Sequence, residues 1–204
     1  MANAKTEMMT TPPAPGHFVN LFHARSVGPD DDPKFGIVMV FDKKDEGHMA
    51  FVNKVAGELN ALTHKTWGVK VSDPSVDNSA LKDGDKLNRP EWKGKYIMRL
   101  KTDRKPKVVD RATGLRDAEE PECYSGALYV CTFNVYAWTF GAAKKGVSGS
   151  LNNVMKHSDG EPIDGRTDPQ DDFAKYAGEG AATGESAPPA GNGADDPALA
   201  NDIL

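Results

Sequence analysis

Only one segment of this 204-residue chain has the spacing of a helix. Across residues 46–62, apolar side chains recur every three or four positions, so they share one face of a helix that packs against a sheet. The residues on that face are Met49, Val52, Val55, Ala56, Leu59 and Leu62. The rest of the core must therefore come from strands, which predicts a mainly β fold.

Five other segments are rich in Tyr, Ile, Val, Phe and Trp, which favour strands. They span residues 18–22, 34–42, 95–102, 107–110 and 125–140, and clusters of Asp, Asn, Ser, Gly and Pro separate them. Five strands and one helix predict a small closed or nearly closed barrel with long loops. The last segment is longer than a usual strand, so we expect a bend, a bulge or two hairpin arms in it.

The two ends of the chain have compositions that do not form a packed core. Residues 1–17 are polar and become rich in Pro, and residues 174–204 consist largely of Ala, Gly, Pro and acidic residues without periodicity. We therefore expect a disordered N-terminal arm, order beginning near Phe18, one folded domain over residues 18–173, and a disordered acidic C-terminal tail.

Charge is divided unequally along the chain. Residues 34–157 contain 21 Lys and Arg against 15 Asp and Glu, whereas residues 161–204 contain 2 basic residues against 10 acidic ones. A basic body joined to an acidic tail predicts a polyanionic ligand and a tail that competes for the same surface. An asymmetry kept only for solubility is the alternative.

Residue types typical of catalytic and metal sites are scattered. Cys123 and Cys131 form no CxxC pair, the five histidines have no paired metal spacing, and no P-loop or GxSxG motif occurs. Asp30, Asp31 and Asp32 lie beside Gly-Pro, where an acidic turn is a simpler interpretation than a cation site. Apolar runs are far shorter than the roughly 20 residues that span a bilayer. The sequence predicts a non-catalytic protein without cofactor, metal or membrane span, in a reducing compartment.

Residues 92–111 interleave cations with aromatic rings. Single-stranded nucleic acids are bound by this combination, because cations follow the phosphates and flat rings stack on bases at about 1–3 kcal/mol each. In a strand over residues 95–102, Arg99 and Lys101 share one face and point away from the core. An ordinary solvated strand face is the alternative for each of them.

Residues 129–140 hold a second group of rings. Alternation places Tyr129 and Phe133 on one side of a strand and Tyr136, Trp138 and Phe140 on the other, without indicating which side is the core. Core packing is the default role of each ring, although so many rings on one segment suggest that some are exposed.

Lys144 and Lys145 precede the segment Gly-Val-Ser-Gly-Ser-Leu. Glycine permits close approach and serine donates hydrogen bonds, so this segment is either a loop that grips phosphate or a part of the chain that closes the barrel.

Eight short motifs run in order along the predicted domain. They are KFGIVMVF at 34–41, LKDGDK at 81–86, KGKY at 93–96, KPKVVD at 105–110, YSG at 124–126, KGVSGSLNNV at 145–154, DGEPIDGR at 159–166 and DDF at 171–173. In this order and spacing they resemble the OB-fold single-stranded DNA-binding proteins of tailed bacteriophages.

The resemblance implies an OB-fold-like five-stranded barrel that binds single-stranded DNA (ssDNA) with little sequence specificity, in phage DNA replication, recombination or repair in the cytoplasm of the infected host. The candidate DNA contacts are Trp92, Lys93, Tyr96, Arg99, Lys101, Arg104, Lys105, Lys107, Tyr129, Trp138, Lys144 and Lys145.

The resemblance also implies that the acidic tail contacts replication or recombination proteins and shields the DNA groove. The candidate partner-binding residues are Asp195, Asp196, Asp202, Ile203 and Leu204. Related tails often end in acidic residues followed by an aromatic residue, whereas this one ends in Leu204, so the sequence does not identify the tail's partner. A homodimer is also compatible with the sequence. The alternative function is a protein-interaction module of the replication machinery whose tail is its main functional element.

Overall fold

The computed structural model describes residues 4–26, 32–141 and 144–163. The elements are β1 (Met9–Thr10), β2 (Ala14–Arg25), β3 (Lys34–Asp42), α1 (Glu46–Trp67), β4 (Leu81–Asp83), β5 (Lys95–Thr102), β6 (Lys107–Asp110), β7 (Arg116–Asp117), β8 (Leu128–Phe140) and β9 (Lys144–Ser158). Three short 3-10 helices lie at Gly84–Lys86, Pro90–Trp92 and Glu120–Glu122. The acidic tail and its five candidate residues, together with Asp30 and Asp31, lie outside the described residues.

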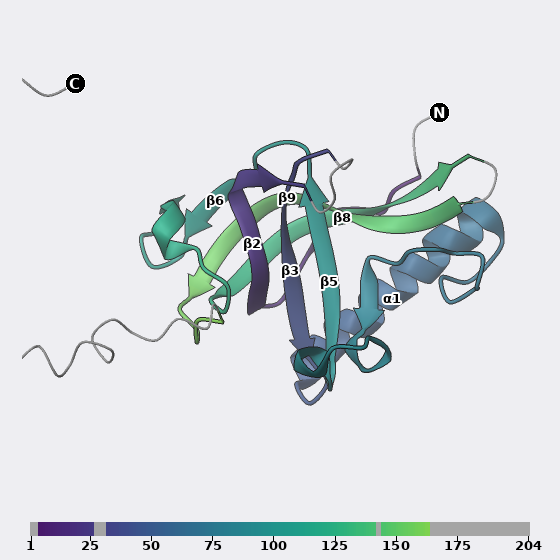
Figure 1. Cartoon of the computed structure of the whole chain (residues 1–204), viewed down its shortest axis with the longest axis horizontal. Coiled ribbons are helices and arrows are strands. Elements are labelled where there is room, and N and C mark those ends of the chain that lie inside the picture. The colour runs from purple at the N-terminus through teal and green to yellow at the C-terminus, as the bar shows by residue number, and fades with distance from the viewer. Residues whose placement is uncertain (1–3, 27–31, 142–143, 164–204) are drawn as a thin grey trace, which may run out of the picture. The chain divides into compact units, whose positions relative to one another are not determined.

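Five strands pair in a closed ring, in the order β8, β2, β3, β5, β9 and back to β8 (Figure 1). All of these pairings are antiparallel except that of β5 with β9. Two of these pairings are short. Strand β2 pairs with β8 only at Ala14 and Pro15, and β5 pairs with β9 only at Leu100 and Lys101. The prediction of a mainly β fold with one helix and a five-stranded ring is confirmed, but β9 takes the fifth place in the ring. The predicted strand at residues 107–110 is β6, which pairs outside the ring.

Helix α1 has a signal at each end and one buried face. The Asp45 carboxylate accepts a hydrogen bond from the His48 amide at 2.8 Å, and Gly68 ends the helix with a φ of 71°. Val52, Val55 and Leu59 are buried as the spacing predicts, although the helix continues to Trp67. No helix in the described part of the chain is long and apolar enough to cross a membrane.

Alternation along the strands separates core from surface. Tyr129 and Phe133 of β8 have no exposed surface, and the same face carries Cys131, Val135 and Ala137. The sequence did not indicate which side of this strand is the core. In the structure, the face that carries Tyr129 and Phe133 is the core, and the face that carries Tyr136, Trp138 and Phe140 is outside. The predicted irregularity of this segment is present as register shifts near Tyr129 and Phe133.

Strands begin before Phe18, where the sequence predicts that order starts. Met9 pairs with Phe133 on the edge of β8, and the Thr11 hydroxyl accepts a hydrogen bond from the Cys131 amide at 3.0 Å. Strand β2 starts at Ala14, which is fully buried. Polar composition did not prevent this pairing, because backbone groups make the ladder and the exposed edge of β8 offers partners for them.

The ring is most sensitive to added volume where β9 approaches β5. A Cβ atom at Gly149 would lie 2.6 Å from Leu100 Cδ2 and 3.0 Å from the Arg99 carbonyl oxygen. We expect Gly149→Ala to lower the free energy of unfolding by about 1–3 kcal/mol, measured by urea denaturation. Gly57→Ala on the exposed face of α1 meets nothing within 4 Å and should raise it by about 0.5–1 kcal/mol. If the two substitutions change the unfolding free energy equally, the contact between β9 and β5 at Gly149 is not tightly packed.

Candidate nucleic-acid interface

A groove of about 800 Å³ runs over the outer face of β5. Its lining comes from Lys34 on β3, Lys82 on β4, Ile97, Arg99, Lys101 and Thr102 on β5, Tyr136 on β8, and Ser148, Gly149 and Ser150 on β9. Residues 78–80, Leu87, Arg89, Trp92 and Asp103 complete it. Segments far apart in the sequence therefore build one continuous surface.

Cations dominate this groove. The lining contains Lys34, Lys82, Arg89, Arg99 and Lys101 against the single carboxylate of Asp103. Asp103 lies 3.1 Å from the Lys34 ammonium and, by hydrogen bonding, raises the pKa of that group, which keeps it charged. Charges of one sign gathered in a cleft create a potential that attracts a polyanion.

The strand geometry of β5 explains why its two cations reach the groove. Met98 and Leu100 point into the core, so Arg99 and Lys101 point outward, as the alternation predicts. Arg99 lies opposite Val38 of β3, and Lys101 lies opposite Ser150 of β9. Both cations therefore sit where three strands meet.

The segment after Lys145 is part of strand β9, not a loop. It pairs with β8 along its length and with β5 at Gly149 and Ser150, so it closes the ring. Its outward residues are small, and Ser148 and Ser150 line the groove. Of the two alternatives from the sequence, the structure shows the segment that closes the barrel, and this closing strand also presents hydroxyl groups to the groove.

Outward rings follow one face of β8. Tyr136 lines the groove, Trp138 is half-buried, and Phe140 is 75% exposed at the end of the strand. Trp138 packs over Gly146, where a Cβ would lie 2.6 Å from the ring, and its Nε1 donates to Ser148 Oγ at 2.9 Å. These contacts fix the Trp138 ring beside the groove.

Three other rings proposed from the sequence are more enclosed. Tyr129 is fully buried and its hydroxyl donates to the Tyr124 carbonyl, so it cannot stack on a base in this structure. Tyr96 packs partly against the core, with the Lys43 ammonium 4.6 Å above its ring centre. Trp92 is 5% exposed, although it contributes to the groove wall.

The remaining predicted cations lie outside the groove lining. Lys93, Arg104, Lys105, Lys107 and Lys144 are exposed, and Lys145 is half-buried with its ammonium 5.5 Å from the Trp67 ring centre. In their place the fold brings in Lys34, Lys82 and Arg89. Sequence reasoning missed these three because no local pattern connects them. The pairing of β3, β4 and β5 brings in Lys34 and Lys82, and Arg89 precedes the short helix whose Trp92 packs on β3 and β5.

A salt-bridge network holds the segment that forms one wall of the groove. The Lys43 ammonium donates to Asp83 Oδ1 at 2.5 Å and to Asp85 Oδ2 at 2.6 Å, and Asp85 Oδ1 accepts from the Gly94 amide. Hydrogen bonding lowers the pKa of both carboxyl groups, and raises the pKa of Lys43. Gly84 is required between them, since a Cβ would lie 2.1 Å from the Trp92 carbonyl oxygen.

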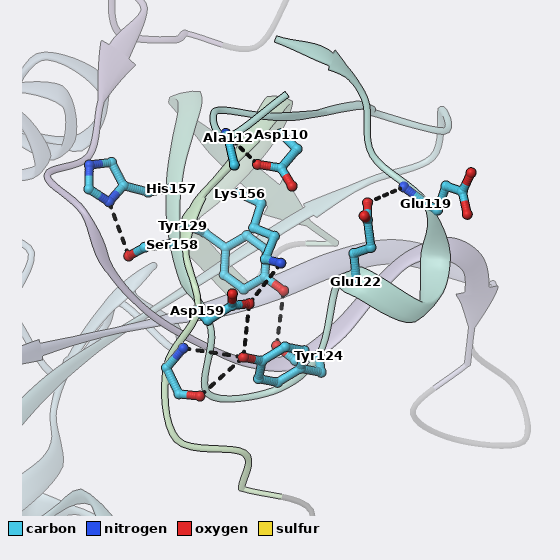
Figure 2. A network of polar contacts seen from close by, with 11 residues as sticks. Asp110, Ala112, Glu119, Glu122, Tyr124, Tyr129, Lys156, His157, Ser158 and Asp159 are labelled. Atoms are coloured by element: carbon cyan, nitrogen blue, oxygen red, sulfur yellow. Dashed lines mark hydrogen bonds and ion pairs between the residues drawn. The ribbon is translucent and has the colours of Figure 1, made fainter. Parts of the chain in front are cut away.

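A second network anchors the end of the described chain (Figure 2). The Lys156 ammonium lies 2.8 Å from the Asp159 carboxylate, and the Tyr124 hydroxyl donates to the same carboxylate at 3.1 Å. The Tyr129 hydroxyl reaches the Tyr124 carbonyl at 2.9 Å, as Figure 2 shows. These contacts join Tyr124 of the YSG motif to the first residues of the DGEPIDGR motif.

A second cavity of about 900 Å³ has a different charge. It is lined by Asp42, Asp45, Glu91 and Glu161 as well as by Lys44 and Lys95. This mixture does not favour a polyanion, so the groove over β5 is the better candidate. Within the described ranges, no group of three or more His, Cys, Asp or Glu residues could hold a metal ion.

A protein-family model described as the ssDNA-binding protein of Enterobacter phage Enc34 matches residues 11–183. The chain belongs to this family. It resembles the solved structure of the single-stranded DNA-binding protein from bacteriophage Enc34, with 23% identity and a TM-score of 0.61, covering 81% of this chain and 89% of that one.

Two further solved structures share the fold. The Enc34 protein in complex with ssDNA matches with 22% identity and a TM-score of 0.60, covering 76% of this chain and 89% of that one. The single-stranded DNA-binding protein gp2.5 of bacteriophage T7 matches with 13% identity and a TM-score of 0.54, covering 89% and 100%. No curated protein matches the chain. The five-strand ring and these neighbours confirm the OB-fold-like prediction.

The Lys43 network makes a prediction about pH. The lowered pKa of Asp83 means that its contribution to stability is present above about pH 4, the unfolded value, and is lost as the pH falls through the folded value. We expect Asp83→Asn to cost about 1.5–3 kcal/mol of unfolding free energy in urea at pH 7. The difference from the wild type should shrink as the pH is lowered below about 4.

Lys43→Met supplies the matched background for that comparison. Without the ammonium, Asp83→Asn should cost much less at pH 7. A loss of the same size with and without Lys43, or one independent of pH, would show that the ion pair does not hold this wall.

Proposed function

We propose that this protein binds ssDNA in the groove over β5, with little preference for sequence. The observation that carries the proposal is that five cations and the aromatic side chain of Tyr136 converge in one groove. This groove lies on the outer face of the five-stranded ring. Cations neutralise phosphates and rings stack on bases, which are the two requirements of ssDNA binding. Membership of a family described as ssDNA-binding supports it.

The arrangement favours single strands over duplex DNA for a physical reason. Tyr136 and Trp138 offer ring faces along one side of β8, and only unpaired bases can stack on them. Arg99, Lys101 and the serines of β9 offer charge and hydroxyl groups to the sugar-phosphate backbone, which is the same for every sequence. The site therefore distinguishes strandedness more than sequence.

The β8–β9 arm extends this track beyond the groove. Phe140 and Lys144 lie opposite each other in the strand pairing at the end of the arm, and both are exposed. We assign them to a flanking nucleotide. Lys93, Arg104, Lys105 and Lys107 lie outside the lining and contribute longer-range attraction to the strand.

The proposed cellular role is to cover ssDNA during phage replication, recombination or repair inside the infected bacterial cell, without catalysis. The acidic tail, with Asp195, Asp196, Asp202, Ile203 and Leu204, is proposed to contact replication or recombination proteins and to shield the groove. The groove itself favours DNA binding over the alternative in which the tail alone is functional, because an interaction module would not need it.

Tyr136→Ala and Arg99→Gln test the two kinds of contact. Tyr136→Ala should weaken binding of labelled oligo-dT about 5- to 150-fold, as expected for one lost base stack, and Tyr136→Phe should bind like the wild type. Arg99→Gln should reduce the slope of log affinity against log salt by about 0.7. The measurement is fluorescence anisotropy at several salt concentrations.

Lys54→Gln on the exposed face of α1 is the charge-matched control and should leave the salt slope unchanged. If Lys54→Gln and Arg99→Gln have the same effect, binding depends on total charge and not on the groove. If the wild type does not bind oligo-dT, the proposed function is wrong.

Removal of residues 178–204 tests the shielding role of the tail. This segment carries only acidic charge, so its loss should tighten ssDNA binding, most strongly at low salt where the tail competes best for the groove. The full-length protein and the protein that ends at residue 177 are compared by the same anisotropy titration. Unchanged or weaker affinity of the shortened chain would exclude shielding.

A further inference from the structure

Phe18 has an unusual backbone conformation for a bulky residue. Its φ is 50°, in the left-handed region that favours glycine, yet its side chain remains 55% exposed. Left-handed backbone costs a non-glycine residue roughly 1–2 kcal/mol, and burial of this ring does not offset that cost. The conformation therefore calls for a reason other than core packing.

A β-bulge in β2 produces this conformation. His17 pairs with Val38 and Asn20 pairs with Gly36, so β2 has one residue more than β3 across this interval. Ala14 and Gly16 face the core, and strict alternation would send Phe18 inward after them. The extra residue turns Phe18 outward, and Leu21 then returns to the core.

The other left-handed non-glycine residue in the described chain, Leu115, has an ordinary explanation. It lies in the tight turn between β6 and β7, where its amide donates to the Asp110 carbonyl at 2.9 Å and Gly114 has a φ of 74°. Connections between antiparallel strands commonly place residues in the left-handed region. Phe18 is within a strand, so no turn accounts for it.

Phe18 contacts Trp92, whose buried indole N–H group is also energetically unfavourable. Its ring centre is 6.5 Å from that of Trp92, at an interplanar angle of 85°. The Nε1 atom of Trp92 is buried without a hydrogen-bond partner among the described residues, and burying such a group unpaired is unfavourable. The Arg89 guanidinium lies 5.0 Å from the Trp92 ring centre, so a cation accompanies the pair.

This pair adjoins the groove. Trp92 and Arg89 both line it, and Trp92 packs on Val38, Val40 and Ile97 of the outer face. Phe18 lies on β2 and is not a lining residue, but it is 55% exposed and contacts Trp92, which is one, so its ring adjoins the groove wall. A flat apolar ring beside a cation has the chemistry to hold a nucleobase with its phosphate nearby.

We propose that Phe18 is a base-stacking platform, braced by Trp92, that adds a nucleotide subsite on β2 to the groove over β5. The proposal rests on the proposed ssDNA binding of that groove. The β2 bulge is then the device that takes this ring out of the core and presents it to a base.

Phe18→Gly is the decisive variant, because glycine tolerates the left-handed backbone while removing the ring. Its melting temperature should equal or exceed that of the wild type. Its affinity for a long oligo-dT should fall about 5- to 150-fold with the salt slope unchanged, since a stacking contact releases no counterion. Phe18→Tyr should bind like the wild type.

Leu115→Gly is the matched control, since it also removes an exposed apolar side chain, 59% exposed, from a left-handed position. It should leave affinity unchanged. An oligo-dT series lengthened one nucleotide at a time adds a second readout. Wild type and Phe18→Gly should bind the shortest members equally and diverge once the strand reaches β2.

The outcomes separate the two proposals. If the wild type binds ssDNA and Phe18→Gly binds equally well at every length, the subsite is wrong and the groove stands. Equal losses in Phe18→Gly and Leu115→Gly would likewise overturn the subsite. A wild type that binds no ssDNA overturns the proposed function, and the subsite with it.

Discussion

The double pairing of β9 is the constraint on which the rest of the structure depends. This strand pairs antiparallel with β8 and parallel with β5, and it thereby closes a sheet that would otherwise have two open edges. Closure fixes the register of both neighbours. Val147 and Leu151 are consequently buried, while Ser148 and Ser150 face outward beside the cations of β5. One strand thus contributes to both the core and the groove.

The groove wall formed by residues 84–94 is held both by apolar burial and by an ion network. It rests on the small cluster of Trp92 with Val38, Val40 and Ile97, which is separate from the main core. The Lys43 ammonium and two carboxylates tie its base to the end of β3. The wall therefore has two supports, a small apolar cluster and an ion network, that are separate from the main core.

Local patterns predicted those parts of the molecule that local physics determines. The helix face follows from spacing, and the outward direction of Arg99 and Lys101 follows from alternation along β5. The convergence of Lys34, Lys82 and Arg89 on the same groove could not be predicted, because it depends on pairings across residues distant in sequence. The strand at Ala14 was missed for a related reason, since backbone pairing with an edge does not require apolar side chains.

Rings on β8 show how one strand can supply both the core and the surface with aromatic side chains. Tyr129 and Phe133 are core residues and Tyr136 and Trp138 are surface residues, and the only difference between the two groups is parity along the strand. A shift of one residue would exchange the groups, burying the surface rings and exposing the core ones. The long pairing with β9 prevents this exchange. On β2, in contrast, the alternation is interrupted. A single inserted residue shifts the inward-outward pattern by one position and places Phe18 on the surface. The position of a bulge therefore determines which side chains reach the surface as much as the identity of the residues does.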